Sequence, residues 1–192
     1  MHGLALALYY SVVLGYLELN PAVVEHLASD LIELSTRHNF AHFLAEGAVC
    51  RGWARSVSGN TAAGIAGIEE GIRDYRAIGS MLFLPFFLAL KAEALHLAGR
   101  TAEALEAIRE GDALVERFEN RYWSAELHRL RAVFLAAMSA DDTHIEASFG
   151  EAIRIAKEQK SVSLATRAEA SYAEYRRQKT SAAGGRAFGL PL

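Results

Sequence analysis

One glycine-containing stretch has part of the pattern of a phosphate-binding loop. Residues 59–64 read GNTAAG, and such a loop needs glycine-rich backbone that ends in a lysine and a hydroxyl residue. Ile65 and Ala66 follow instead, so neither the lysine nor the hydroxyl is present. We interpret this stretch as a turn that ends one helix and precedes the next.

Three residues near one another in the sequence have side chains that can bind metals. These are His38, His42 and Cys50, but neither a Cys-x-x-Cys nor an HExxH spacing accompanies them. A helix break is expected at Asn39, between the two histidines. We interpret the histidines as surface or partly buried residues and expect no metal and no cofactor.

The acidic pairs of the chain are the remaining candidates for catalysis. Glu69-Glu70 is expected on a solvated helix face, and Asp141-Asp142 in a polar loop. No Ser, His and Asp residues occur around a recognisable nucleophile turn. The sequence therefore predicts a protein that is not an enzyme.

Composition narrows the classes of partner and compartment. The chain has 192 residues, with 20 basic and 23 acidic side chains and a net charge of −3, which argues against nucleic acid as a main ligand. A single cysteine indicates a reducing compartment. The apolar residues 2–18 lack a basic leading segment and are too short for a membrane span, so we expect a buried helix in a soluble, cytoplasmic protein that does not bind membranes.

Helix-forming residues dominate the chain and predict an all-α fold. Asn20 followed by Pro21 is a typical helix start, and Thr143 with Glu146 has the spacing of a capping box. Thr61 and Thr101 are expected to cap their helices. No stretch reads as a strand. The expected helices span residues 3–18, 21–37, 40–57, 61–78, 81–98, 101–118, 122–139, 143–158 and 162–178.

A repeated stretch organises these helices. GNTAAGIAGIEEG at 59–71 returns as GRTAEALEAIREG at 99–111, a spacing of 40 residues. A repeat at such a period predicts stacked helical hairpins, each of which needs a neighbour to bury its apolar stripe. Gly71 and Gly111 fall in the middle of helices, where glycine is unfavourable, so we expect two helix backbones to approach closely there.

The pattern resembles the tetratricopeptide repeat. It differs from that repeat in its spacing of 40 rather than the usual 34 residues and in lacking the closing proline. The resemblance implies a right-handed superhelix over residues 1–179, and residues 180–192 are expected to form a flexible tail. The matching small, large and turn positions are Ala92, Leu95, Gly99, Ala104, Ile108 and Gly111, with Gly52, Gly59, Gly64, Ile68 and Gly71, and more loosely Ala132, Ile145, Phe149 and Ala152.

The longer spacing is similar to that of a more particular group. The stretches GIRDYRAIGSMLFLPFFLALKAEALHLAGRTAEAL and ENRYWSAELHRLRAVFL resemble the C-terminal repeat region of large bacterial regulators. Those proteins carry an adenylate/guanylate cyclase domain, a predicted ATPase domain and then such repeats. The resemblance implies a regulatory or scaffolding segment in signalling and carries over no catalytic residue.

By this resemblance, one set of positions faces inward and would bind a protein or peptide partner. An alternative is a sensor that holds a small ligand or peptide in the same groove, and self-association is left open. A second alternative is that Trp53 and Phe86 are core residues and the charges are ordinary surface. The expected partner-binding residues are Glu46, Val49, Trp53, Phe86, Ala89, Glu93, His96, Glu126 and Arg129.

Overall fold

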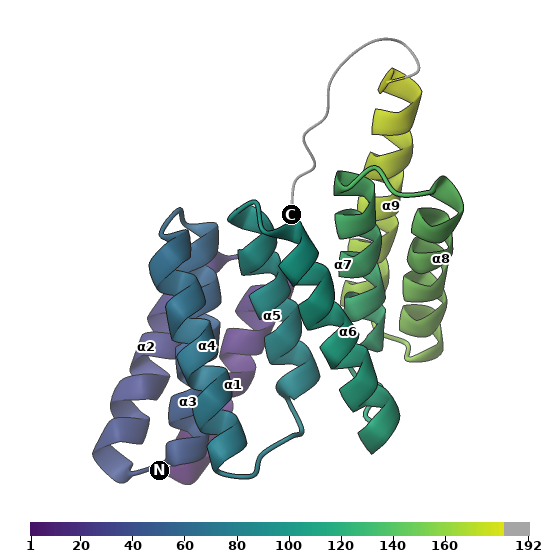
Figure 1. Cartoon of the computed structure of the whole chain (residues 1–192). Coiled ribbons are helices and arrows are strands. Elements are labelled where there is room, and N and C mark those ends of the chain that lie inside the picture. Colours follow the sequence, from purple (N-terminus) through teal and green to yellow (C-terminus); the bar gives the residue numbers. More distant parts are fainter. Residues whose placement is uncertain (183–192) are drawn as a thin grey trace. The chain divides into compact units, whose positions relative to one another are not determined.

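The computed structural model describes residues 1–182 of the chain (Figure 1). That part contains nine helices and no strand, as the sequence predicts. The helices are α1 (His2–Leu17), α2 (Pro21–His38), α3 (Ala41–Val57), α4 (Thr61–Ala77), α5 (Leu84–Leu97), α6 (Thr101–Phe118), α7 (Ser124–Ala137), α8 (Asp142–Glu158) and α9 (Val162–Ala182).

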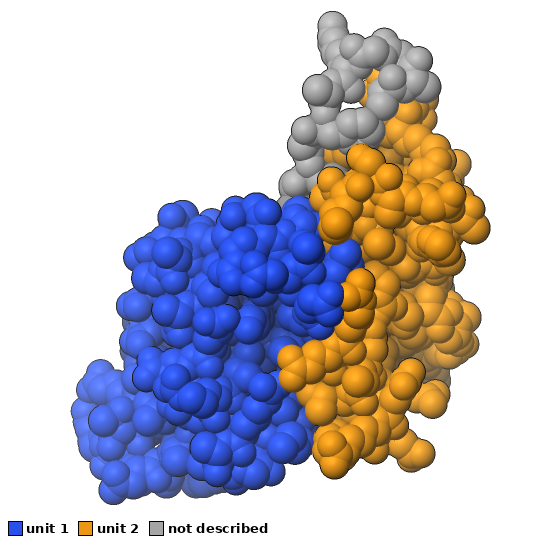
Figure 2. All heavy atoms as spheres, viewed as in Figure 1, with its two compact units in different colours: residues 1–107 blue, residues 108–192 orange. Residues whose placement is uncertain are grey.

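The chain divides into two compact units, which Figure 2 colours separately. The first comprises Met1–Ala107 and the second begins at Ile108, so the boundary falls within α6. A single solenoid over residues 1–179 was expected. Helix α9 extends past that predicted end to Ala182, and the rest of the predicted tail lies outside the described residues.

In the first unit, α3 is the central helix and contacts α1, α2, α4 and α5. Its core is rich in aromatic side chains from helices far apart in the sequence. The Tyr16 ring lies 4.9 Å from that of Trp53 and 5.2 Å from that of Phe86, in edge-to-face geometry in both cases. Such pairs add to the apolar burial that holds the helices together.

Glycines allow α3 and α4 to approach closely. A Cβ atom on Gly52 would lie 2.7 Å from the carbonyl oxygen of Gly64, and one on Gly71 would lie 2.9 Å from that of Ala45. The close backbone approach predicted for Gly71 is therefore confirmed. At Gly111 the expected approach of two helix backbones is not found, because the nearest atoms belong to the Leu127 side chain, at 3.0 Å.

In the second unit, α7, α8 and α9 contact one another pairwise. Phe134 of α7 and Phe149 of α8 are completely buried, and the Phe149 ring lies 5.8 Å from that of Tyr175 on α9. In this unit α7 is buried on most of its sides, whereas α8 and α9 each bury one face.

The start of α2 is as the sequence predicts. Asn20 Oδ1 accepts a hydrogen bond from the Val23 amide at 3.2 Å, and Pro21 is the first helical residue. Gly59 and Gly99 have φ angles of +98° and +74° in the turns that end α3 and α5. These left-handed conformations explain why glycine occupies both positions.

The predicted threonine caps are wrong. Thr61 and Thr101 are the first residues of α4 and α6, and their hydroxyls bond to the Ser56 carbonyl and to His96 Nδ1 respectively. Asn60 occupies the N-cap position of α4. A hydroxyl one residue inside the helix no longer faces the free amides of the first turn.

The capping box expected at α8 is also wrong. Asp141 is the N-cap residue of this helix, and its side chain accepts a hydrogen bond from the Thr143 amide at 2.8 Å. A carboxylate at this position satisfies an amide of the first turn and interacts favourably with the helix dipole.

Helix α1 is buried on one face only, whereas burial of most of it was expected. Tyr9, Val12 and Tyr16 are buried, and the opposite face is exposed because no other described element covers it. Among the described residues, no helix combines the length and the apolar character that crossing a membrane would require. The exposed apolar side chains of α1 are Leu4, Leu6, Tyr10 and Leu14.

Candidate functional site

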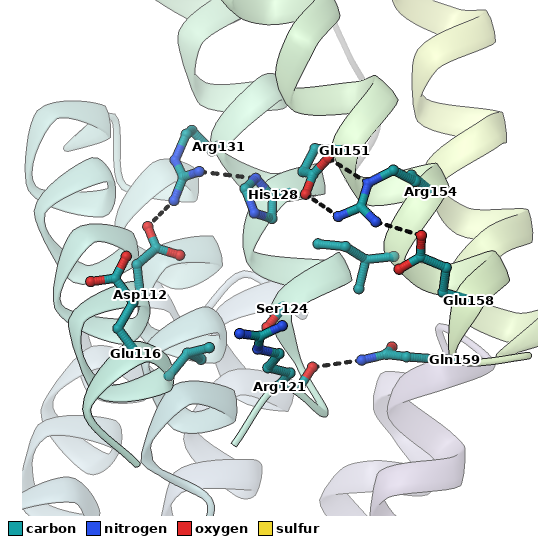
Figure 3. A pocket seen from close by; sticks show the side chains of 12 residues that line it. Asp112, Glu116, Arg121, Ser124, His128, Arg131, Glu151, Arg154, Glu158 and Gln159 are labelled. Atoms are coloured by element: carbon teal, nitrogen blue, oxygen red, sulfur yellow. Dashed lines mark hydrogen bonds and ion pairs between the residues drawn. The ribbon is translucent and has the colours of Figure 1, made fainter. Parts of the chain in front are cut away.

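A groove of about 420 Å³ lies among α6, α7 and α8 in the second unit (Figure 3). We call it the α6–α8 groove. Charged side chains from all three helices and from the turn before α7 line it, so the helix packing of this unit brings together charges that are distant in sequence. The lining residues are Asp112, Val115, Glu116, Arg121, Ser124, His128, Arg131, Glu151, Arg154, Ile155, Glu158 and Gln159.

Two arginines fix the charge pattern of the groove wall (Figure 3). Arg131 pairs with Asp112 across the groove and lies 3.0 Å from His128 Nδ1. On the α8 side, Arg154 is held by Glu151 and Glu158, each at 2.5 Å. These pairs leave the wall charged but internally compensated.

Three other polar groups of the groove have no partner among the described residues. The Glu116 carboxylate and the Arg121 guanidinium are exposed and make no ion pair or side-chain hydrogen bond. The Ser124 hydroxyl is buried and likewise makes no hydrogen bond. A buried hydroxyl without a partner is unfavourable, so a ligand that reached it from the groove would gain by supplying the missing bond.

His128 is the one imidazole that lines the groove. Burial lowers its pKa, the nearby Arg154 lowers it further, and Glu151 opposes them. The imidazole is therefore uncharged at neutral pH. Ser124 lies one turn earlier on α7, but no hydrogen bond joins it to His128, so the pair lacks the contact of an activated nucleophile.

The residues expected to line a concave binding face are mostly buried. Their exposed fractions do not exceed 2% for Glu46, Trp53, Phe86, Glu93, Glu126 and Arg129, and Val49 and Ala89 are fully buried. His96 is partly buried. For Trp53 and Phe86 the arrangement corresponds to the alternative that they are core residues. The assignment of the set to a partner stays a prediction.

Several of these residues bond to one another instead. Trp53 Nε1 donates a hydrogen bond to Glu93 Oε2 at 2.6 Å in the first unit. In the second unit, Glu126 Oε1 accepts from Arg129 and from Arg167, both at 2.8 Å. Buried charges need such partners, and these bonds supply them.

The residues considered as metal ligands do not form a cluster that could hold a metal. No group of three or more His, Cys, Asp or Glu side chains within residues 1–182 has the required arrangement. Cys50 is buried, and His42 lies instead beside a pocket of the first unit described below.

Sequence reasoning missed the α6–α8 groove. Glu116, Arg121, Glu151 and Arg154 read as ordinary surface charges on the polar faces of helices. A signal was present in the turn between Glu119 and Tyr122, where a basic residue lies in the break between two helices. That signal alone does not show which helix the residue faces.

A comparison with known proteins finds one distant relative and no family. No family model matches the chain. A protein of Rhizobium meliloti (strain 1021), described as uncharacterized, is 29% identical over 148 residues. The aligned region is 77% of this chain but 14% of that protein, so the chain spans a small part of the relative's length.

Proposed function

We propose that the chain is a non-enzymatic helical-repeat module that binds a peptide or protein segment in the α6–α8 groove. The observation that carries this proposal is a set of three groups in the groove without a partner among the described residues, two of them exposed charges of opposite sign. Glu116 offers an anion, Arg121 a cation, and Ser124 a buried hydroxyl without a hydrogen bond. A peptide that carries both charges can satisfy all three, because its backbone supplies donors and acceptors next to its side chains.

The tetratricopeptide-like superhelix and a role in a larger signalling protein are part of the same proposal. The repeat at a spacing of 40 residues supports the first, since stacked hairpins commonly present extended binding surfaces. The relative of much greater length supports the second, because a region that is 14% of a protein suits one module among several. A cyclase or ATPase elsewhere in the same protein would be the activity that such a module regulates.

A peptide library displayed on phage and selected on the full chain tests the proposal. Selected peptides are then measured by fluorescence polarisation against a charge-swapped variant, Glu116→Lys with Arg121→Glu. We expect affinity to fall at least about tenfold, because two charge-assisted contacts become repulsive. Neither substitution removes an ion pair within the described residues, so the fold should be retained.

The matched control swaps an exposed pair outside the groove, Glu33→Lys with Arg37→Glu. These residues form an i,i+4 ion pair on α2, and the swap preserves both the net charge and the pair. We expect unchanged peptide affinity. Equal binding by wild type and both variants would show that the groove is not the binding surface.

A further inference from the structure

A second pocket, of about 360 Å³, lies in the first unit between α1, the start of α3 and the turn before α5. We call it the aromatic pocket. His2, Leu6 and Phe40 lie toward its rim, and Phe43, Tyr9 and Glu46 are buried below them. No lysine or arginine is among its lining residues.

Rings surround much of this pocket. The Phe43 ring lies 5.0 Å from that of His2 and 5.6 Å from that of His42. Tyr9 and Phe83 also line the pocket, and their ring centroids lie 5.1 Å apart. Aromatic faces carry partial negative charge, so walls of this kind attract an apolar group and also a cation.

The polar groups at the bottom of the pocket are not satisfied. Glu46 is 0% exposed, and neither of its carboxyl oxygens makes a hydrogen bond among the described residues. His42 Nε2 lies 3.0 Å from Glu46 Oε1 but without hydrogen-bond alignment. The buried Tyr9 hydroxyl also lacks a hydrogen-bond partner. Leaving a buried carboxyl and a hydroxyl without hydrogen bonds costs stability, and a donor that enters the pocket would remove that cost.

From this geometry we propose that the aromatic pocket binds a small organic ammonium ion with an apolar body. Its N–H groups donate hydrogen bonds to the Glu46 carboxylate and the Tyr9 hydroxyl oxygen, and its carbon chain lies among Phe40, Phe43 and Phe83. The proposal does not depend on the α6–α8 groove, which belongs to the other unit.

The protonation of Glu46 links such binding to pH. Burial raises the pKa of Glu46 to about 8, so the free pocket holds a neutral carboxyl at pH 7. A cation favours the ionised form, and binding releases a proton there. Affinity should therefore rise as the pH rises toward 8 and level off above it.

Other groups that face Glu46 do not titrate in the same range. Burial raises the pKa of Tyr9 from α1, of Cys50 from α3 and of Tyr75 from α4, and the charge of Glu46 raises each further. Burial and the charge of His2 lower the pKa of His42, which is therefore neutral above pH 7. His2 itself is an exposed rim imidazole, so the pH profile is repeated in a His2→Gln variant.

Isothermal titration calorimetry with three probes of one shape tests the proposal. Phenethylammonium is the cation, 2-phenylethanol its neutral counterpart and phenylacetate the anion. At pH 8.5 we expect the cation to bind at least about tenfold more tightly than the alcohol, and the anion most weakly. Between pH 6.5 and 8 the affinity for the cation should rise by up to about tenfold per pH unit.

Glu46→Gln keeps the shape of the side chain and removes its charge. It should abolish both the preference for the cation and its pH dependence, while binding of 2-phenylethanol changes little. Tyr9→Phe should lower the affinity for the cation by about three- to tenfold. Glu18→Gln, at an exposed position outside the pocket, serves as the matched control and should bind like wild type.

Two results would overturn the proposal. One is equal affinity of the wild type for phenethylammonium and 2-phenylethanol, which would make the pocket merely apolar. The other is a cation preference that survives in Glu46→Gln. Circular dichroism of each variant checks that a loss of binding is not a loss of fold.

Discussion

Glu46 of the first unit and Glu126 of the second are buried carboxyls that differ in their hydrogen bonds. Both are almost completely inaccessible, with 0% and 1% exposed, and they lie two repeat spacings apart, with Phe86 midway. Arg129 and Arg167 donate hydrogen bonds to Glu126, and no hydrogen bond reaches Glu46. The two carboxyls are therefore equally buried but differ in whether they accept hydrogen bonds. Glu126 accepts charge-assisted hydrogen bonds, whereas Glu46 has the His42 imidazole 3.0 Å away without a hydrogen bond and is the carboxyl to which we assign a ligand.

The largest expected effect comes from removing the partnered charge. Glu126→Gln removes the negative charge that pairs with the buried Arg129 and Arg167, and breaking such a cluster from one side costs about 3–5 kcal/mol. Urea unfolding followed by circular dichroism measures the loss. Glu116→Gln, on an exposed side chain, should change the free energy of unfolding by less than about 0.5 kcal/mol. A small loss for Glu126→Gln would mean that the arginines find other partners and that the two carboxyls are less different than described.

The second largest expected effect is that of Glu46→Gln, which should raise the free energy of unfolding by an amount that depends on pH. The pKa of Glu46 is about 8 in the folded chain, above that of an unfolded glutamate, so the folded state holds an extra proton between about pH 4.5 and 8. The protonated Glu46 carboxyl contributes fully to stability below about pH 4.5, and this contribution is lost as the pH rises through that range to 8. The free energy of unfolding of Glu46→Gln should therefore equal that of wild type near pH 4.5 and exceed it at pH 8.5 by a few kcal/mol.

Urea unfolding of wild type and Glu46→Gln at pH 4.5, 6.5 and 8.5 measures that divergence. Other titrating groups cancel in the difference between the two proteins. A constant difference across the three pH values would show that Glu46 is ionised in the folded chain.

The smallest expected effect concerns the glycines of the two repeats. Gly71→Ala would place its Cβ within 2.6 Å of Val49 Cγ2 and 2.9 Å of the Ala45 carbonyl oxygen. Because a backbone atom cannot yield easily, we expect a loss of about 1–3 kcal/mol. At Gly111 the neighbour is the flexible end of Leu127, and the higher helix propensity of alanine offsets the contact, so the change should stay within about 1 kcal/mol. Equal losses in thermal melts would contradict this distinction.

The helices could be predicted from the sequence because their signals are local. Asn20-Pro21 sets the start of α2, and Gly59 and Gly99 mark the ends of α3 and α5 through backbone conformations that favour glycine. Gly71 was predicted to lie at a close helix contact because glycine is unfavourable within a helix. The same argument was wrong for Gly111, whose nearest neighbours are atoms of the Leu127 side chain.

The candidate sites could not be predicted because they depend on which side chains meet across helices. Trp53 and Glu93 looked like exposed members of a binding face, but each satisfies the other inside the first unit. Conversely, nothing local distinguishes Glu46, whose burial without a hydrogen bond is visible only once α1, α3 and α4 are assembled around it. Unsatisfied groups are properties of tertiary packing, and no periodicity reports them.

The rate at which Cys50 is labelled can report how often the first unit opens. It is the single cysteine of the chain, it is buried, and its neighbour Glu46 adds to the burial that raises the pKa of its thiol. A thiol-alkylating reagent needs the exposed thiolate, so labelling of the folded protein proceeds only through molecules in which α3 has transiently separated from its neighbours. The labelling rate, divided by that of the urea-unfolded chain, then gives the population of those open molecules, and a ligand in the aromatic pocket would slow it.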